Sequence, residues 1–326
     1  MKKLLSLVLC LIMVCSLVAC GNSESTESGE PAAEATELTF GTGGDQGTYY
    51  GYGSVLSQYV SEKTDVSVTA VTSKGSQANI EDMAAGDIQL GFVQSDVMSY
   101  AYSGTNLFEE KVEGFSTVAA LYMEQVQIVT LNPEIKSVAD LAGKTVSIGA
   151  TGSGVYFNAL DILGVYGLTE EDIDPVYQAF GDSVESLQDG KIDAAFIVAG
   201  APTTAVSSIA ATNDVYLVNL DEEHIASLIE LSPYYSKNVI AADVYGTEDD
   251  CTTVAIGAVL IARDDVAEDA IYSVVSTIFE NTAEITESHA KGGELDIAFA
   301  SSITDVPYHA GAAKYFAEKD IEVPTK

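Results

Sequence analysis

The sequence predicts an α/β fold of two lobes joined by a hinge. Short apolar runs alternate along the chain with stretches of helical periodicity, which is the pattern of βαβ units. This alternation occurs in two successive sets, and a chain of 326 residues is long enough for two α/β domains. Hydrophobic residues make up 47% of the chain, as expected of a globular protein rather than a disordered one.

The first set begins near residue 37. Its expected elements are strands at 38–40, 66–71, 88–93, 115–122 and 125–131, and helices at 49–62 and 75–85. Loops rich in Gly and Ser follow several of these strands. In open α/β sheets, ligands lie beyond the carboxyl ends of the strands, where such loops meet helix N-termini. This end of the first set is therefore a candidate binding site.

The second set repeats the pattern. Its expected elements are strands at 144–148, 176–180, 192–198 and 216–220, and helices ending near 166 and spanning 183–188. A long apolar strand is expected at 252–262, and the remainder is mainly helical. We expect residues 37–124 plus 264–326 to form lobe I and residues 125–263 to form lobe II, with connecting strands between them.

The first twenty residues have the pattern of a bacterial lipoprotein signal. Lys2 and Lys3 precede an apolar stretch at 4–16 that is shorter than a membrane span requires, and small residues then lead to Cys20. We expect residues 1–19 to be a signal peptide, Cys20 to carry lipid, and residues 20–36 to be a flexible acidic tether. The expected location is the extracytoplasmic face of a cell membrane.

The charge is strongly acidic, with 14 Lys+Arg against 49 Asp+Glu and a formal net charge of −35. Removal of Lys2 and Lys3 leaves 12 basic residues against the 49 acidic ones, a net charge of −37. Such a surface repels phosphate backbones, so nucleic acid is excluded as a partner. Arg263 is the only arginine and precedes two aspartates, so an anionic ligand needs another kind of positive group.

Catalytic and metal-binding patterns are missing from the sequence. The chain has neither a phosphate-binding G-x-x-x-x-G-K-[ST] motif nor a G-x-S-x-G nucleophile motif. His224, His289 and His309 lie far apart, and Cys251 has no second cysteine in the body of the chain. We therefore expect no catalytic residue, no metal and no cofactor, and a protein that is not an enzyme.

Four strand-to-helix junctions carry the candidate binding chemistry, at 43–50, 73–79, 94–96 and 151–154. Each one supplies backbone N–H groups at a helix start together with a hydroxyl or amide side chain. Any one of them alone is better explained as an ordinary cap or turn. Four such junctions in two α/β sets favour a site that holds a carboxylate without arginine.

The same loops resemble a known family, the TAXI-type solute receptors of TRAP transporters. The resemblance runs in order from about residue 37 to the end of the chain. The matching segments are Gly41-Thr42-Gly43-Gly44, Gly47-Thr48-Tyr49-Tyr50, Gly75-Ser76 with Asn79, Gln94-Ser95-Asp96, Asp140-Leu141-Ala142-Gly143-Lys144, Gly152-Ser153-Gly154, Gly190-Lys191-Ile192-Asp193, Gly200-Ala201-Pro202-Thr203 and His309-Ala310-Gly311-Ala312.

The resemblance implies a type II periplasmic-binding-protein fold, in which two α/β lobes close by hinge bending on a ligand in the cleft between them. It implies a small carboxylate ligand, such as glutamate or a C5 dicarboxylate, and a monomer that delivers it to an integral membrane TRAP subunit. The ligand-binding residues carried over by position are Gly44, Tyr49, Ser76, Asn79, Gln94, Ser95 and Asp96 from lobe I, and Gly152, Ser153, Gly154, Pro202 and Thr203 from lobe II. Lys74 is either a local positive charge for the ligand or a solvated loop lysine.

Two other functions remain open. A binding protein of an ABC importer for a small organic anion would have the same fold and composition, and only the family motifs separate it from a TRAP receptor. A neighbouring gene for an ATPase or for a TRAP permease would distinguish them. A surface enzyme acting on a small carboxylate is a remote alternative, distinguished by turnover of its ligand.

Overall fold

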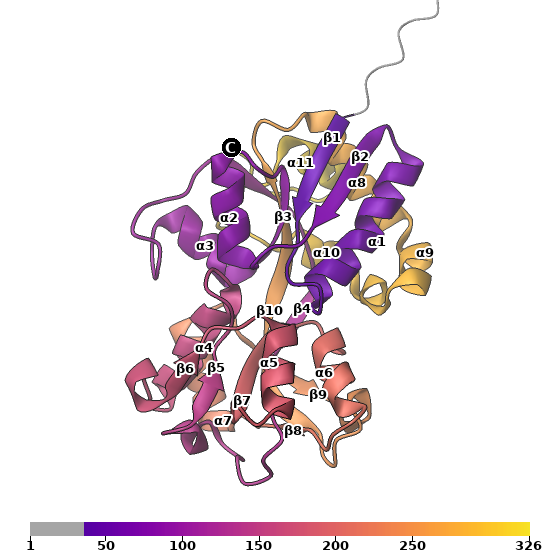
Figure 1. Cartoon of the computed structure of the whole chain (residues 1–326). Helices are drawn as coiled ribbons and strands as arrows, with labels where there is room; N and C mark the ends of the chain where they lie inside the picture. The colour runs from indigo at the N-terminus through magenta and orange to yellow at the C-terminus, as the bar shows by residue number, and fades with distance from the viewer. Residues whose placement is uncertain (1–35) are drawn as a thin grey trace, which may run out of the picture. The chain divides into compact units, whose positions relative to one another are not determined.

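The computed structural model describes residues 36–326, so the expected signal peptide, the lipidated Cys20 and almost all of the tether lie outside the described residues. A single 10-stranded sheet runs through the described part of the chain (Figure 1). Its strands are β1 (Thr36–Gly41), β2 (Val66–Val71), β3 (Leu90–Gln94), β4 (Phe115–Thr130), β5 (Thr145–Ser147), β6 (Asp174–Val176), β7 (Ala194–Ala199), β8 (Tyr216–Leu217), β9 (Ser236–Ile240) and β10 (Cys251–Arg263).

Helices flank this sheet. They are α1 (Thr48–Lys63), α2 (Ser76–Ala85), α3 (Ser95–Ser103), α4 (Gly154–Val165), α5 (Phe180–Gln188), α6 (Thr204–Ala210), α7 (Glu222–Leu231), α8 (Glu268–Glu280), α9 (Thr282–Ser288), α10 (Ile297–Ala300) and α11 (Ala310–Ala317). Short 3₁₀ segments lie at Val138–Leu141, Glu170–Asp172, Ala242–Val244 and Ala290–Glu294. In residues 36–326, no helix has both the length and the apolarity needed to cross a membrane.

The strand order is β2-β1-β3-β10-β4-β7-β5-β6, and it contains the same arrangement twice. β2, β1 and β3 are parallel to one another and β10 adds to β3 antiparallel. Likewise β6, β5 and β7 are parallel and β4 adds to β7 antiparallel. We call β1–β3 with α1–α3 and α8–α11 the first region, and β5–β9 with α4–α7 the second region.

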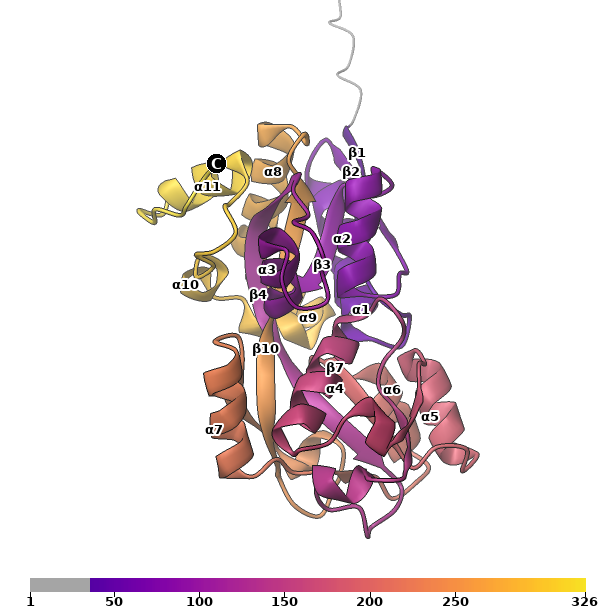
Figure 2. The same ribbon diagram turned by 90° about the vertical axis from the view of Figure 1, so that its left-hand side faces the viewer.

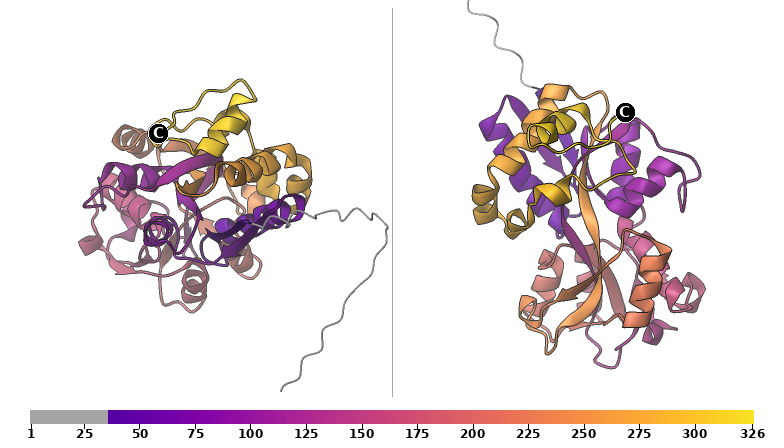
Figure 3. Two further views of the ribbon diagram at one scale, coloured as in Figure 1. Left: turned by 90° about the horizontal axis from the view of Figure 1, so that it is seen from above. Right: turned by 180° about the vertical axis from the view of Figure 1, so that it is seen from behind.

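β4 and β10 belong to both regions, and they pair with each other antiparallel from Phe115↔Arg263 to Gln125↔Ala255. The later part of β4 pairs with β7, and the early part of β10 pairs with β9. Figure 3 (right) shows β10 running through both regions. The chain thus crosses between the regions on two adjacent long strands.

The sequence predicted two strands at 115–122 and 125–131, and this was wrong, because β4 is continuous. Met123 and Glu124 pair with Gly257 and Ile256 of β10 and make no turn. Neither residue type favours a turn, and Glu124 is only 2% exposed. The polar pair Glu124-Gln125 that interrupted the apolar run is therefore a buried part of the strand.

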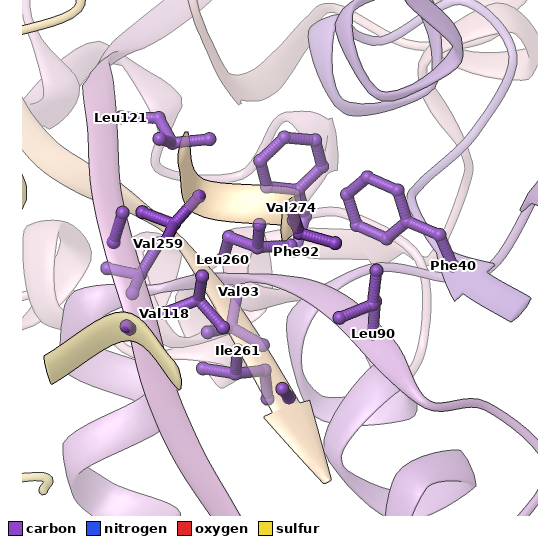
Figure 4. Close-up of a cluster of buried hydrophobic side chains, with 14 of the residues drawn as sticks. Phe40, Leu90, Phe92, Val93, Val118, Leu121, Val259, Leu260, Ile261 and Val274 are labelled. Carbon is purple, nitrogen blue, oxygen red and sulfur yellow. The ribbon is translucent and has the colours of Figure 1, made fainter. Parts of the chain in front are cut away.

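The first region has one continuous hydrophobic core. Residues of β1 and β3 pack there against residues of β10 and of α8. Figure 4 shows part of this cluster, with Phe40, Leu90 and Phe92 beside Leu260 and Ile261. Strand β3 is buried at every residue, as expected for a strand covered by helices on both faces.

The second region has two separate cores, one on each face of its part of the sheet. Successive residues of β7 alternate between them, with Phe196 in one core and Ile197 in the other. α4 and α7 cover the first of these faces, through residues such as Leu163 and Leu228. α5 and α6 cover the other, through residues such as Leu187 and Val206.

The strand predicted at 176–180 was also wrong, because β6 ends at Val176 and α5 begins at Phe180. The apolar residues of this segment do not form a buried strand face. Tyr177 is 49% exposed, and Phe180 is only partly buried. A short apolar run does not by itself separate a strand from a loop that leads into a helix.

Candidate functional site

A cavity of about 120 Å³ lies between the two regions. It is bordered by loops at the carboxyl ends of the parallel strands and by the middle of β4. Its lining residues are Gly43, Gly44, Gly47, Thr48, Tyr49, Ser73, Lys74, Gly75, Ser76, Gln94, Glu124, Ala150, Ser153, Gly154, Val155, Gln178, Ala179, Phe180, Val198 and Ala199.

Helix starts are the main feature of this cavity. Within residues 36–326, five helices have their N-cap residue in its lining: α1, α2, α3, α4 and α5, with caps Gly47, Gly75, Gln94, Ser153 and Ala179. None of these five caps makes a side-chain capping hydrogen bond to a described residue. Each helix start carries partial positive charge on its N–H groups. The cavity therefore offers an anion a positive potential that comes from the backbone.

The hydroxyl of Tyr49 and the carboxyl of Glu124 form one wall of the cavity. The Tyr49 hydroxyl donates to Oε2 of Glu124 at 2.7 Å, and the Tyr49 ring stacks on Phe92 with ring centroids 4.8 Å apart. Burial raises the pKa of Glu124 to about 8, the nearby Asp96 carboxyl raises it further, and the Tyr49 hydrogen bond opposes the shift. Protonated Glu124 is thus well populated at neutral pH and does not repel an anion as a carboxylate would.

Three lining residues each have a buried polar atom without a hydrogen-bond partner among the described residues: Oε1 of Gln94, Oγ of Ser153 and Oε1 of Gln178. Gln94 is fixed on its other side, because its Nε2 donates to Oδ1 of Asn158 at 2.9 Å and its backbone N–H donates to Oγ of Ser76 at 3.0 Å. A buried acceptor without a donor is costly. Gln94 Oε1 is therefore suited to accept a hydrogen bond from a ligand.

The structure brings together about half of the sequence-predicted site residues. Six of them line the cavity: Gly44, Tyr49, Ser76, Gln94, Ser153 and Gly154. They come from the starts of α1, α2, α3 and α4, as expected from the junctions at the ends of the strands. Their contact with a ligand remains a prediction.

Three predicted residues of the first region lie behind this lining rather than in it. Asn79 is fully buried and its Nδ2 donates to the backbone carbonyls of Thr42 and Phe92. Ser95 is buried next to Gly257 of β10. Asp96 is buried and accepts hydrogen bonds from Asn158 and from the backbone N–H of Val97.

Three predicted residues of the second region also lie outside the lining. Gly152 borders a neighbouring surface groove, and its carbonyl accepts from the N–H of Ala78 at 3.0 Å. Pro202 is exposed and follows a cis peptide bond. Thr203 is buried, where its hydroxyl donates to the carbonyl of Gly200 and accepts from Gln127.

Sequence reasoning missed two parts of the cavity. Glu124 was overlooked because the chain there was assigned to a gap between two strands, although an acid within a long apolar run is itself a signal of a special position. The residues Gln178, Ala179 and Phe180 were overlooked because the segment was assigned to a strand. They add a fifth helix start, that of α5.

The basic side chains are distributed unevenly around the cavity. Lys74 is exposed at the cavity's rim and also borders the neighbouring groove. Arg263 lies at the far end of β10, where it contacts Asp265 at 2.6 Å and the carbonyl of Gly86 at 3.0 Å. The sole arginine of the chain is thus bound to other residues away from the cavity.

The two regions touch across the cavity. A Cβ on Gly154 would lie 1.6 Å from Oε1 of Gln94, so only glycine fits at this approach of α4 to β3. The hydroxyl of Thr48 donates to the carbonyl of Gly200 at 2.8 Å, and the N–H of Ala205 donates to the carbonyl of Gln46 at 3.1 Å. The two regions therefore contact each other beside the cavity.

Metal chemistry finds no support in the side-chain arrangement. Over residues 36–326, His, Cys, Asp and Glu side chains do not form a group of three or more that could hold a metal ion. Cys251 is buried, and burial raises the pKa of its thiol to about 12, so it is an unreactive core residue.

The chain is similar to a known protein family and to several solved structures. A model described as the NMT1-like family matches residues 40–319. The alkanesulfonate-binding protein SsuA from Xanthomonas axonopodis pv. citri, bound to MOPS, has 17% identity and a TM-score of 0.50 over 89% of this chain and 93% of its own. PhnD1 from Prochlorococcus marinus, in complex with methylphosphonate, has 12% identity and a TM-score of 0.55 over 80% of this chain and 91% of its own.

An ancestral arginine-binding protein bound to arginine has 14% identity and a TM-score of 0.50, over 78% of this chain and 98% of its own. These likenesses concern the fold. They confirm the predicted two-lobed α/β fold of periplasmic solute-binding proteins. They do not support the finer assignment to TAXI receptors, which remains a prediction from the motifs.

Proposed function

The chain belongs to the NMT1-like family, and we propose that it captures a small organic anion between its two regions and passes it to a membrane importer. The observation that carries this proposal is the convergence of five helix starts on one cavity. Helix starts attract anions through their N–H groups and their dipoles. No arginine is needed, which agrees with the composition of the chain.

The ligand we propose also carries a hydrogen-bond donor. Gln94 and Glu124 line the same cavity as the helix starts, and each has an oxygen that can accept a hydrogen bond. An anion with an amino or hydroxyl group satisfies the helix starts at one end and these acceptors at the other. Glutamate-like carboxylates, sulfonates and phosphonates with such a group all belong to this class.

For the importer, we propose the ABC class ahead of the TRAP class. Two of the fold relatives hold a sulfonate and a phosphonate, which are small organic anions. They agree better with the alternative of an ABC-type binding protein for such an anion than with a dedicated carboxylate receptor. The TRAP partner rests on the motif resemblance alone. Uptake that follows ATP hydrolysis in reconstituted vesicles supports the ABC class, and uptake driven by an ion gradient overturns it.

Capture outside the cytoplasm follows from the same proposal. The lipoprotein signal pattern that ends at Cys20 supports an anchor on the outer face of the membrane, where the protein meets both ligand and importer. Metabolic labelling with a palmitate analogue tests this, since Cys20→Ala then loses the label.

The ligand class is tested by thermal-shift measurements with matched pairs of probes: glutamate against glutarate, and taurine against ethanesulfonate. Ligand binding stabilises the folded state by about 2.7 kcal/mol at a hundredfold excess over Kd. The amino-bearing member of a pair is expected to raise the unfolding midpoint more, because its donor satisfies the acceptors and it therefore binds more tightly. Equal shifts within each pair overturn the role of the acceptors. An absence of shifts with every anionic probe overturns the proposal. Consumption of a bound probe supports the enzyme alternative instead.

Gly154→Ala tests whether the ligand-induced shift of the unfolding midpoint depends on the close contact between the two regions. The new Cβ clashes with Gln94 of the other region, while alanine is well suited to the first turn of α4 itself. The expected result is a folded protein whose ligand-induced shift is lost. Gly164→Ala is the matched control, because a Cβ there meets nothing within 4 Å among the described residues.

A further inference from the structure

A phenylalanine of the second region is buried in the core of the first. Phe157 lies on α4, yet it is 1% exposed within the hydrophobic cluster of the first region. Its ring stacks against Tyr100 of α3 at 6.2 Å and against Phe108 at 5.9 Å, measured between ring centroids. Figure 2 shows α4 directly beneath α2 and α3. Separation of α4 from α3 would expose this ring to water.

The next residue, Asn158, connects the two regions by hydrogen bonds. Its Oδ1 accepts from Nε2 of Gln94 at 2.9 Å, and its Nδ2 donates to Oδ2 of Asp96 at 2.8 Å. Both partners belong to the first region. Nδ2 also donates to the hydroxyl of Tyr235, at 3.0 Å, within its own region. Asn158 is fully buried, so these bonds have no competition from bulk water.

This network ends in the cavity. Gln94 lines the cavity and donates from its Nε2 to Asn158, while its buried Oε1 has no partner among the described residues. Because its Nε2 is held by Asn158, the side-chain amide of Gln94 points its Oε1 in a fixed direction. Whether Oε1 faces the ligand therefore depends on Asn158, a residue that does not itself line the cavity.

We propose that Phe157 and Asn158 form a latch between α4 and α3 that holds the two regions closed, and that Asn158 is a positioning residue for ligand capture because it orients Gln94. The latch deepens the proposed function and rests on it. The latch then adds side-chain contacts to the two strands, β4 and β10, that connect the regions covalently.

Two backbone amides report on closure without any ligand. The N–H of Ala78, near the start of α2, has the carbonyl of Gly152 in the other region as its partner at 3.0 Å, and the N–H of Ala205 has that of Gln46 at 3.1 Å. Hydrogen exchange of these amides in the full chain, relative to amides in the β4–β10 ladder, measures opening of the regions separately from unfolding.

Asn158→Asp places a carboxylate against Asp96 and removes the donor between them. The expected result is exchange at Ala78 that is about tenfold faster or more, since the hydrogen bond from Asn158 to Asp96 is lost and two buried carboxyl groups are placed in contact. Ladder amides keep their rate. Phe157→Ala has the same effect on Ala78, and Gly164→Ala on the same helix has none.

A double variant in which the Asp and Asn side chains are swapped distinguishes a specific latch from a general loss of packing. In the double variant Asp96→Asn with Asn158→Asp, the new carboxylate accepts from both Gln94 and the new amide. Exchange at Ala78 is then expected within about threefold of the original rate, with recovery of the ligand-induced shift. A purely structural role predicts no such recovery.

An unchanged Ala78 rate in Asn158→Asp, with the ladder intact, overturns the latch. Equal acceleration of the Ala78 and ladder amides also overturns it, because the residue then contributes only to folding. Failure of the proposed function has a different signature: none of the probe anions shifts the midpoint of the unaltered protein, whatever the exchange rates of the variants are.

Discussion

The two regions have the same strand arrangement but different interiors. Each has three parallel strands with an antiparallel strand added from β4 or β10. The first region fills one continuous core with aromatic rings in contact, such as those of Phe40, Tyr52 and Phe92. The second divides its interior into two cores made mainly of aliphatic side chains. One topology thus supports two kinds of packing.

The regions also differ in what they give the cavity. The first contributes polar side chains held from behind, with Tyr49 stacked on Phe92 and Gln94 bonded to Asn158. The second contributes Ser153 and Gln178 within a lining that is otherwise backbone and apolar surface, such as Gly154 and Phe180. We infer that the first region selects the ligand and the second covers it.

The largest expected effect is on stability. Phe92→Ala should lower the free energy of unfolding by about 3–5 kcal/mol, because Phe92 is fully buried and packs against Phe40 and Tyr49. Phe196→Ala is the counterpart in the second region, equally buried. We expect it to cost about 1 kcal/mol less, since aromatic pairs add to burial. Urea unfolding followed by circular dichroism measures both losses. An equal or larger loss for Phe196 would remove the contrast between the two cores.

A pH dependence of stability comes next. Burial raises the pKa of Glu124 to about 8 and that of Asp96 to about 7 in the folded chain. In the unfolded chain both groups ionise near pH 4, so each stabilises the folded state fully below that pH, and the contribution is lost progressively as pH rises from about 4 through the folded pKa of about 7 or 8. The slope is about 1.4 kcal/mol per pH unit for each group.

Glu124→Gln tests this dependence, because glutamine still accepts from Tyr49 but does not titrate. Unfolding between pH 5 and pH 8.5 should show a shallower fall in stability than that of the unaltered chain. Parallel curves for the two proteins would mean that Glu124 does not carry a proton in the folded state.

A smaller effect is expected at Ser153. Its hydroxyl is buried without a partner among the described residues, so Ser153→Ala should change the unfolding free energy by less than about 0.5 kcal/mol while weakening ligand binding by about five- to tenfold. Ser137→Ala is the contrast, because Ser137 caps a 3₁₀ segment by accepting from the N–H of Ala139. That loss should cost about 1 kcal/mol. A comparable cost at Ser153 would identify it as a structural cap.

The smallest effect concerns Lys74, whose two interpretations the sequence left open. The side chain is exposed at the rim of the cavity, so Lys74→Gln should weaken anion binding by only about two- to threefold, with the difference disappearing in 0.5 M salt. Calorimetric titration at two salt concentrations provides the measurement. A tenfold loss that persists in salt would make Lys74 a direct ligand contact.

Much of the first region was predictable from the sequence because its signals are local. Strand β2 was predicted at its observed bounds, and the starts of α1 and α2 within a residue, since Gly-rich loops mark where strands end and helices begin. Gln94 and Ser153 were likewise found at such junctions. The fold class follows from this alternation.

The rest depends on tertiary contacts that have no local signal. Glu124 is part of the cavity only because β4 continues through it, beside a strand about 130 residues later in the chain. Asp96 and Asn79 look like ligand contacts in the sequence, but they bond to Asn158 and to backbone carbonyls. Whether a polar side chain faces the cavity or the protein is decided by partners that a linear pattern does not reveal.

The helix starts around the cavity have a consequence for how such a protein can change over evolutionary time. Their positive potential belongs to peptide groups, which every sequence with this backbone possesses. Single substitutions of side chains do not remove it, and it persists at pH values where lysine or histidine would lose charge. Ligand preference can therefore drift through a few positions, such as Tyr49, Gln94 and Glu124, while the capacity to hold an anion is inherited with the fold.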